Sequence, residues 1–276
     1  MNPFQKQMLL LCVCLFALSG QAIADPLSDA KDAYRAGDYT KAEMLYAPLA
    51  QQGNAEAQTN LGSIYENGKG VPQDYKKALE WYSMAAEQGY VYAQFNLGFM
   101  YANGQGVPQD YKKALKWYRL AAKQGDVLAQ YTLGVMHARG QGVKQNYKEA
   151  AKWYRLAAKQ GDTQARYNLG VMYAGGQGVK QDYKEAAKLW ALAAGQDYVF
   201  AQANLGTLYA NGKGVPLDYL RSYMWYSIAA ANARAGDLQQ NAASQRDSVA
   251  KKMTARQISA AQQLGAACTA KKFKGC

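Results

Sequence analysis

The turn "NGKGVPQDY", residues 67–75, contains the residue types that hold phosphate groups in many proteins. Gly68, Lys69 and Gly70 make a glycine-rich turn with a cation, and Asp74 stands just before a predicted helix. Glycine turns that lead into helix N-termini can cradle phosphates. A phosphate loop follows a strand, however, whereas here a helix precedes the turn and valine follows the second glycine. We therefore interpret the stretch as a helix-to-helix turn, in which Gly68 closes the first helix and Asp74 caps the second.

Residues for nucleophilic or acid–base catalysis are sparse. His137 is the only histidine, and it occupies a position that tyrosine holds in equivalent segments, so it is interpreted as a packing residue. Ser-x-x-Lys, a β-lactamase pattern, occurs at 28–31 and 248–251, but the chain contains neither Ser-Asp-Asn nor Lys-Thr-Gly. H-E-x-x-H and G-x-S-x-G do not occur either. We therefore expect no enzyme activity, no bound metal ion and no cofactor.

Residues 1–24 have the organisation of a cleavable export signal. A lysine precedes an apolar run at 8–18, and the segment ends in Ala22-Ile23-Ala24, with small residues where signal peptidase reads them. The apolar run is shorter than the roughly 20 residues that a membrane-spanning helix requires. We expect cleavage after Ala24 and a mature chain in the periplasm or outside the cell.

Cys268 and Cys276 are the only cysteines after the export signal. In an exported chain, two cysteines at this spacing most simply form a disulfide, here between the last predicted helix and the tail. A redox or zinc site is the alternative, but no histidine lies nearby and the spacing is not C-x2-C. We predict the disulfide.

The opening turn recurs every 36 residues along most of the chain. Each copy is preceded by a segment such as "AQTNLGSIY" and followed by one such as "DYKKALEWYSMAA". Periods of this length are typical of solenoids. The later copies of the turn are NGQGVPQDY (103–111), RGQGVKQNY (139–147), GGQGVKQDY (175–183) and NGKGVPLDY (211–219).

Each repeat is predicted to form two amphipathic helices, and no segment shows the alternation of a strand. Gly62 stands in the middle of the first helix, where glycine costs about 1 kcal/mol relative to alanine. We expect that this glycine allows a neighbouring helix to approach closely. The apolar face of the first helix consists of Ala57, Leu61, Ile64 and Tyr65. That of the second helix consists of Tyr75, Ala78, Leu79, Tyr82, Ala85 and Ala86.

The combination A-Q-x-N-L-G-x-x-Y, G-x-G-V-x-x-D-Y and A-x-x-W-Y-x-x-A-A at this spacing resembles the Sel1-like repeat family, which is related to tetratricopeptide repeats. The resemblance implies an all-α fold, a right-handed superhelical α-solenoid of helix hairpins, and a role as a scaffold for protein contacts. Some exported members of the family are described as β-lactamases, but those pair cysteines within each repeat, and these repeats contain none. The resemblance covers residues 53–232, as five units: 53–88, 89–124, 125–160, 161–196 and 197–232.

The segments on either side of the repeats are predicted to cap the solenoid. Residues 25–52 are interpreted as one capping hairpin of the tetratricopeptide form. Residues 233–276 are interpreted as a C-terminal helical cap, with a polar helix at roughly 237–252 and a second helix after Thr254. Thr254 and Gln257 have the spacing of a capping box, which supports the start of that second helix.

The first helices offer the candidate binding surface. In the family that the chain resembles, these helices line the concave side of the superhelix, where aromatic rings and asparagines would suit an extended peptide. The alternative is that the rings pack between hairpins and the asparagines bond to a neighbouring loop. We call ten of these positions the groove residues: Asn60, Tyr92, Phe95, Asn96, Phe99, Tyr131, Tyr167, Asn168, Phe200 and Asn204.

Two second helices carry cations at i, i+4, i+7 and i+11, opposite their apolar faces. The net charge of +12 permits an anionic partner such as an envelope component, and the alternative is a solvated face. Nucleic acid is a poor candidate, because no recognition motif is present. We call the eight cations the basic stripe: Lys112, Lys116, Arg119, Lys123, Lys148, Lys152, Arg155 and Lys159.

The sequence therefore predicts an exported scaffold that binds a protein or an extended peptide through its concave face. The alternative is an envelope hydrolase, or a β-lactam- or peptidoglycan-binding protein, built on the same repeats.

Overall fold

The computed structural model describes residues 25–271 and 273, and every regular element within them is an α-helix. The predicted export signal and Cys276 lie outside the described residues. The helices are α2 (Pro26–Arg35), α3 (Tyr39–Gln51), α4 (Ala55–Asn67), α5 (Tyr75–Glu87), α6 (Val91–Asn103), α7 (Tyr111–Lys123), α8 (Val127–Arg139), α9 (Tyr147–Lys159), α10 (Thr163–Gly175), α11 (Tyr183–Ala194), α12 (Val199–Asn211), α13 (Tyr219–Asn232), α14 (Asp237–Ala250) and α15 (Ala255–Ala270).

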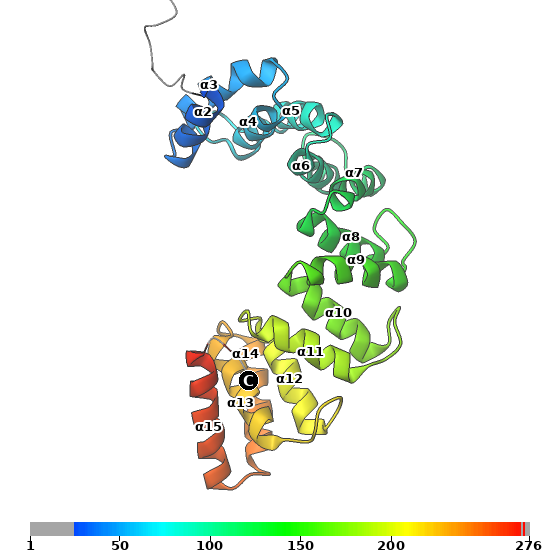
Figure 1. Ribbon diagram of the computed structural model, residues 1–276, viewed down its shortest axis with the longest axis vertical. Helices are drawn as coiled ribbons and strands as arrows, with labels where there is room; N and C mark the ends of the chain where they lie inside the picture. The colour runs from blue at the N-terminus through cyan, green and yellow to red at the C-terminus, as the bar shows by residue number, and fades with distance from the viewer. Residues whose placement is uncertain (1–24, 272, 274–276) are drawn as a thin grey trace, which may run out of the picture. The chain divides into compact units, whose positions relative to one another are not determined.

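From α2 to α13 the helices pair two by two as hairpins (Figure 1). The chain divides into two compact units, one containing α2–α5 and the other α6–α15. Within the first unit each helix packs against the next, and the same order runs from α6 to α13 in the second. The two last helices, α14 and α15, both pack against α13. The described chain is therefore an all-α solenoid, as the repeats predict, with two further helices on its last repeat.

The recurring turn connects helices as predicted. Gly68 ends α4 in the left-handed conformation, with a φ of 62°. The Asp74 side chain caps α5 by accepting hydrogen bonds of 3.0 Å from the backbone N–H groups of Lys76 and Lys77. Asn146 takes the place of the aspartate in one copy, and it caps α9 by accepting a 3.1 Å hydrogen bond from the Glu149 N–H.

Lys69 and Gly70, the part of the turn that resembles a phosphate loop, contact the preceding hairpin. The Lys69 ammonium donates a 3.1 Å hydrogen bond to the Tyr34 hydroxyl. Its nitrogen also lies 5.0 and 4.9 Å from the ring centroids of Tyr34 and Tyr39. Gly70 has a φ of 70°, and a Cβ there would lie 2.7 Å from the backbone nitrogen of Thr40. The cation and the second glycine thus join two hairpins.

Each repeat hairpin is closed by an aromatic ring of its second helix, which lies against a glycine of its first. A Cβ on Gly62 would come within 2.8 Å of the Tyr82 ring, so the expected close approach at Gly62 is confirmed. Both the glycine backbone and the ring are buried. The equivalent pairs are Gly98–Tyr118, Gly134–Tyr154, Gly170–Trp190 and Gly206–Tyr226.

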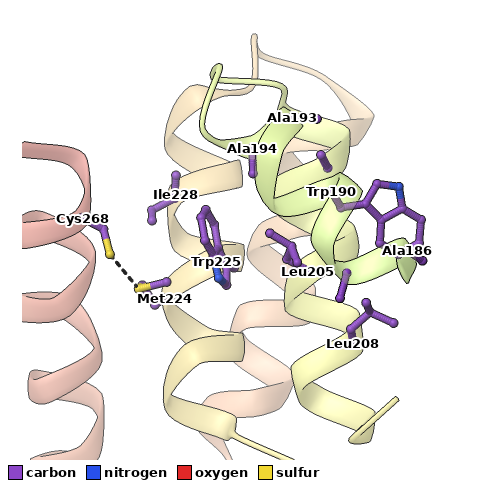
Figure 2. Packing of buried hydrophobic residues seen from close by; sticks show 12 residues of the cluster. Ala186, Trp190, Ala193, Ala194, Leu205, Leu208, Met224, Trp225, Ile228 and Cys268 are labelled. Atoms are coloured by element: carbon purple, nitrogen blue, oxygen red, sulfur yellow. Dashed lines mark hydrogen bonds between the residues drawn. The ribbon is translucent and has the colours of Figure 1, made fainter. Parts of the chain in front are cut away.

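An apolar core joins α15 to the last repeat. Cys268 is buried, and its Sγ lies 3.7 Å from the Sδ of Met224 on α13 (Figure 2). The Thr254 capping box begins α15, as predicted. The disulfide between Cys268 and Cys276 stays a prediction, because Cys276 lies outside the described residues.

Candidate functional site

The aromatic groove residues fall into two groups. Tyr92, Phe99 and Phe200 expose 60%, 42% and 48% of their surface. The other three are half-buried, each against a ring of the second helix in its own hairpin. The centroid distances are 5.4 Å for Phe95–Tyr118, 5.9 Å for Tyr131–Tyr154 and 6.5 Å for Tyr167–Trp190. The half-buried rings therefore contribute to packing, and so does Phe200, whose ring centroid lies 6.0 Å from that of Tyr167. Among the exposed rings, Phe99 borders a pocket that is described below.

Asparagines of one first helix reach the tyrosines of the preceding first helix. Burial raises the pKa of Tyr131, and a hydrogen bond from the Asn168 side chain acts in the opposite direction. Burial likewise raises the pKa of Tyr167, against a hydrogen bond from Asn204. These asparagines are half-buried, as are Asn96 in the same unit and Asn60 in the first unit. The asparagine contacts join neighbouring repeats, while the binding role of the ten groove residues stays a prediction.

A pocket of about 310 Å³ lies between α6 and α8, which we call the α6–α8 pocket. Two groove residues, Phe95 and Phe99, line it, together with Thr132 and Val135 of α8. The Tyr118 ring of α7 also faces it. Because apolar atoms dominate this lining, the pocket suits a bulky apolar side chain.

A second pocket, the α12–α14 pocket, has a volume of about 410 Å³ and combines groove residues with the C-terminal cap. Phe200 and Asn204 contribute from α12, and the Tyr226 hydroxyl lies 2.9 Å from the Thr207 hydroxyl. The contribution of α14 was not predicted, although polar residues along this helix and just beyond its end recur at i, i+4, i+7 and i+11. The residues with this spacing that line the pocket are Asn241, Gln245 and Ser248 of α14 and Lys252, which follows it.

The candidate catalytic residues are not assembled into a catalytic group. Lys31 of the first Ser-x-x-Lys pattern forms an ion pair of 2.8 Å with Glu56. Ser248 of the second pattern lines the α12–α14 pocket, whereas Lys251 is exposed and does not line it. No group of three or more His, Cys, Asp or Glu side chains within residues 25–271 could hold a metal ion.

His137 is buried in α8. At the equivalent position of α10, Tyr173 accepts a 3.2 Å hydrogen bond from Arg155. Within the part of the chain that the structure describes, His137 Nδ1 has no hydrogen-bond partner. Burial lowers its pKa, the nearby Arg119 lowers it further, and Glu149 acts in the opposite direction. This environment agrees with a packing residue that replaces a tyrosine.

All eight residues of the basic stripe are exposed, four on α7 and four on α9. Lys152 forms an ion pair with Glu149 on its own helix. The other seven form no ion pair with any carboxylate of the described residues. The stripe is therefore a cationic surface with little internal compensation.

The Sel1 repeat model matches five consecutive segments of the chain, which together span residues 55–233, well over half its length. The chain belongs to the Sel1 repeat family. The matched segments are 55–90, 91–126, 127–162, 163–198 and 199–233, and the first of them begins where α4 begins.

Two solved Sel1-type structures are similar to this chain. A Sel1 repeat protein from Oxalobacter formigenes shares 37% identity with a TM-score of 0.72, over 75% of this chain and 86% of that one. The protein c5321, a protective antigen present in uropathogenic Escherichia coli strains, also shares 37% identity, with a TM-score of 0.75 over 87% of this chain. The similarity spans about half (51%) of the c5321 chain. A search of curated proteins finds no match.

The Sel1 repeats are joined by buried glutamines, which the repeat pattern did not predict. Gln130 of α8 donates a 3.2 Å hydrogen bond to the Ala122 carbonyl at the end of the preceding repeat. Its own carbonyl accepts a 2.9 Å bond from Gln160 at the end of α9. The same arrangement places Gln58 between the Ala50 carbonyl and Gln88. The glutamine after the alanine in each "AQ" segment therefore satisfies backbone groups between Sel1 repeats.

No described helix combines the length and the apolar character that crossing a membrane would require.

Proposed function

We propose that this Sel1 repeat protein is an exported scaffold that binds an extended peptide segment of a partner protein along its first helices. Sel1 repeat proteins are generally scaffolds for protein contacts, and the proposal adds the surface, the kind of ligand and the location. The observation that carries it is the α6–α8 pocket, where the exposed Phe99 borders an unfilled apolar space of about 310 Å³. Large exposed rings beside such a pocket are typical of a recognition surface.

The asparagines support the same ligand. An extended peptide exposes backbone N–H and C=O groups at regular intervals, and side-chain amides can bond to both. Asn96, Asn168 and Asn204 occupy equivalent positions next to the rings, a position that Thr132 holds in the remaining repeat of this unit. Their half-exposed position leaves part of each side chain accessible to such a backbone.

The export part of the proposal rests on residues 1–24. The similarity to c5321, a protective antigen, agrees with a location outside the cytoplasm. N-terminal sequencing of the protein recovered from periplasm and culture medium tests this part. A first residue of Asp25 supports cleavage after Ala24, and an intact Met1 contradicts it.

A crosslinking pull-down tests the binding surface, with the purified mature chain as bait. Phe99→Ser should abolish partner capture, whereas Met44→Ser should leave capture and the melting temperature unchanged. Met44 is an equally suitable site for substitution because it lies on α3, outside the groove residues, and is 68% exposed. Equal capture by both variants would contradict the proposed surface.

The alternative function, a β-lactam-binding protein or hydrolase, is favoured by one observation: Ser248 lines the α12–α14 pocket. Incubation of the mature chain with a chromogenic β-lactam tests it. Turnover that is lost in Ser248→Ala would replace the scaffold proposal with an enzyme.

A further inference from the structure

The basic stripe has an apolar component. Leu156 stands between Lys152 and Lys159 on the exposed face of α9 and exposes 46% of its surface. The equivalent Leu192 on α11 is 54% exposed, and Leu120 on α7 is half-buried. The three side chains occupy the same position in three successive repeats, and we call them the leucine row.

The leucine row and the stripe face the same side of the solenoid. On α9 the positions 152, 156 and 159 are spaced i, i+4 and i+7, so the leucine and its two flanking cations share one helix face. The hairpins α6–α7, α8–α9 and α10–α11 pack in the same order along one compact unit. Equivalent residues of successive second helices therefore point to the same side.

The charge around the leucine row is predominantly positive. Helix α7 contains no aspartate or glutamate, and neither do the first helices of this unit. The two glutamates on the second helices, Glu149 and Glu185, form ion pairs with Lys152 and Lys188. A ligand of this surface must therefore supply the negative charge that the protein lacks.

We propose that the basic stripe and the leucine row bind an acidic amphipathic helix of a partner protein. A helix of this kind has one apolar stripe with carboxylates on either side. Its apolar stripe contacts the leucine row, and its carboxylates meet Lys116, Arg119 and Lys123 on α7 and Lys152, Arg155 and Lys159 on α9. This surface is separate from the groove residues, so one molecule holds two partner segments at once.

The structure favours a protein helix over a bilayer as the ligand. Interfacial membrane binding relies on a broad apolar helix face of tryptophan, phenylalanine or leucine that enters the headgroup region, whereas each second helix here presents one leucine of the row. The tryptophans next to the stripe, Trp117 and Trp153, are half-buried, and Trp153 packs against the core between α7 and α8. The leucine row places one leucine on each of three successive second helices. Together they form a line of apolar contacts for one helix of the partner.

The test uses the full mature chain and a synthetic peptide of about 18 residues, with leucine at heptad a and d positions and glutamate elsewhere. Fluorescence anisotropy at low salt measures its affinity. Lys123→Glu with Lys159→Glu should weaken binding by about tenfold or more. The matched control, Lys144→Glu with Lys180→Glu, changes the net charge equally at exposed turn positions and should weaken binding by less than about threefold.

The leucine row is tested separately. Leu156→Ser with Leu192→Ser should weaken peptide binding by about tenfold, whereas Leu217→Ser, at an exposed leucine of a turn, should not. If Lys123→Glu with Lys159→Glu and its charge control lose the same peptide affinity, net charge alone explains the loss. That result would overturn the proposal. Binding to vesicles of phosphatidylglycerol, without binding to the peptide, would overturn it in favour of a membrane surface.

Discussion

The Tyr154 ring of α9 lies directly on the backbone of Gly134 in α8: a Cβ on Gly134 would come within 2.5 Å of ring carbons. Tyr154 is buried by this contact. Glycine in the middle of a helix is unfavourable by about 1 kcal/mol relative to alanine, so the packing must compensate for it. The pair sets how closely the two helices of a Sel1 repeat approach one another.

Gly134→Ala should therefore destabilise the protein by about 1–3 kcal/mol, although alanine is the better helix former. Gly175→Ala is the matched control, because Gly175 also lies in a first helix and its added Cβ would meet nothing closer than 3.6 Å. Urea unfolding of the mature chain measures both. A neutral Gly134→Ala variant would show that the ring moves aside without cost.

The glutamine bridges make a second prediction about stability. Gln130→Leu removes two hydrogen bonds made by a buried side chain, one to the Ala122 carbonyl and one from the Gln160 amide, which should cost about 1–3 kcal/mol. Gln263→Leu, at an exposed position on α15, should change the free energy of unfolding by less than about 0.5 kcal/mol. Similar unfolding curves for the two variants would mean that the Gln130 hydrogen bonds do not stabilise the fold.

The sequence predicted the helices, the turns and the glycine contacts because each depends on local spacing. The glutamine bridges depend on which carbonyl the amide meets in the next hairpin, and helical periodicity does not contain that information. The α12–α14 pocket was missed because the repeat pattern ends before α14, so Asn241 and Ser248 have no equivalents to align with. The groove rings illustrate the same limit: Phe95 and Phe99 are similar in sequence, yet one packs and the other is exposed.

His137 predicts how stability depends on pH. Burial and Arg119 hold its folded-state pKa below the ordinary value of 6.5, so the unfolded chain binds more protons in this range. The stabilisation present at neutral pH should therefore be lost as the pH falls from 6.5 towards the folded-state pKa. Melting temperatures of the wild type and of His137→Tyr, between pH about 7.5 and 5, measure the effect.

The His137→Tyr variant carries the residue found at the equivalent positions 101 and 173. It therefore removes the titrating group and keeps an aromatic ring in the packing. Its melting temperature should fall less steeply with acid than that of the wild type. Parallel curves would mean that His137 is not the group that titrates.

The central claim is that a partner segment lies along the first helices, and site-specific photocrosslinking tests it most directly. A photoreactive phenylalanine analogue at Phe99, beside the α6–α8 pocket, is compared with one at Met44 on α3. Both variants are expressed with the leader and irradiated in intact cells. The account predicts a discrete protein adduct from position 99, which Phe95→Ser reduces, and none from position 44. Equal adducts from both positions, or none from position 99, would contradict it.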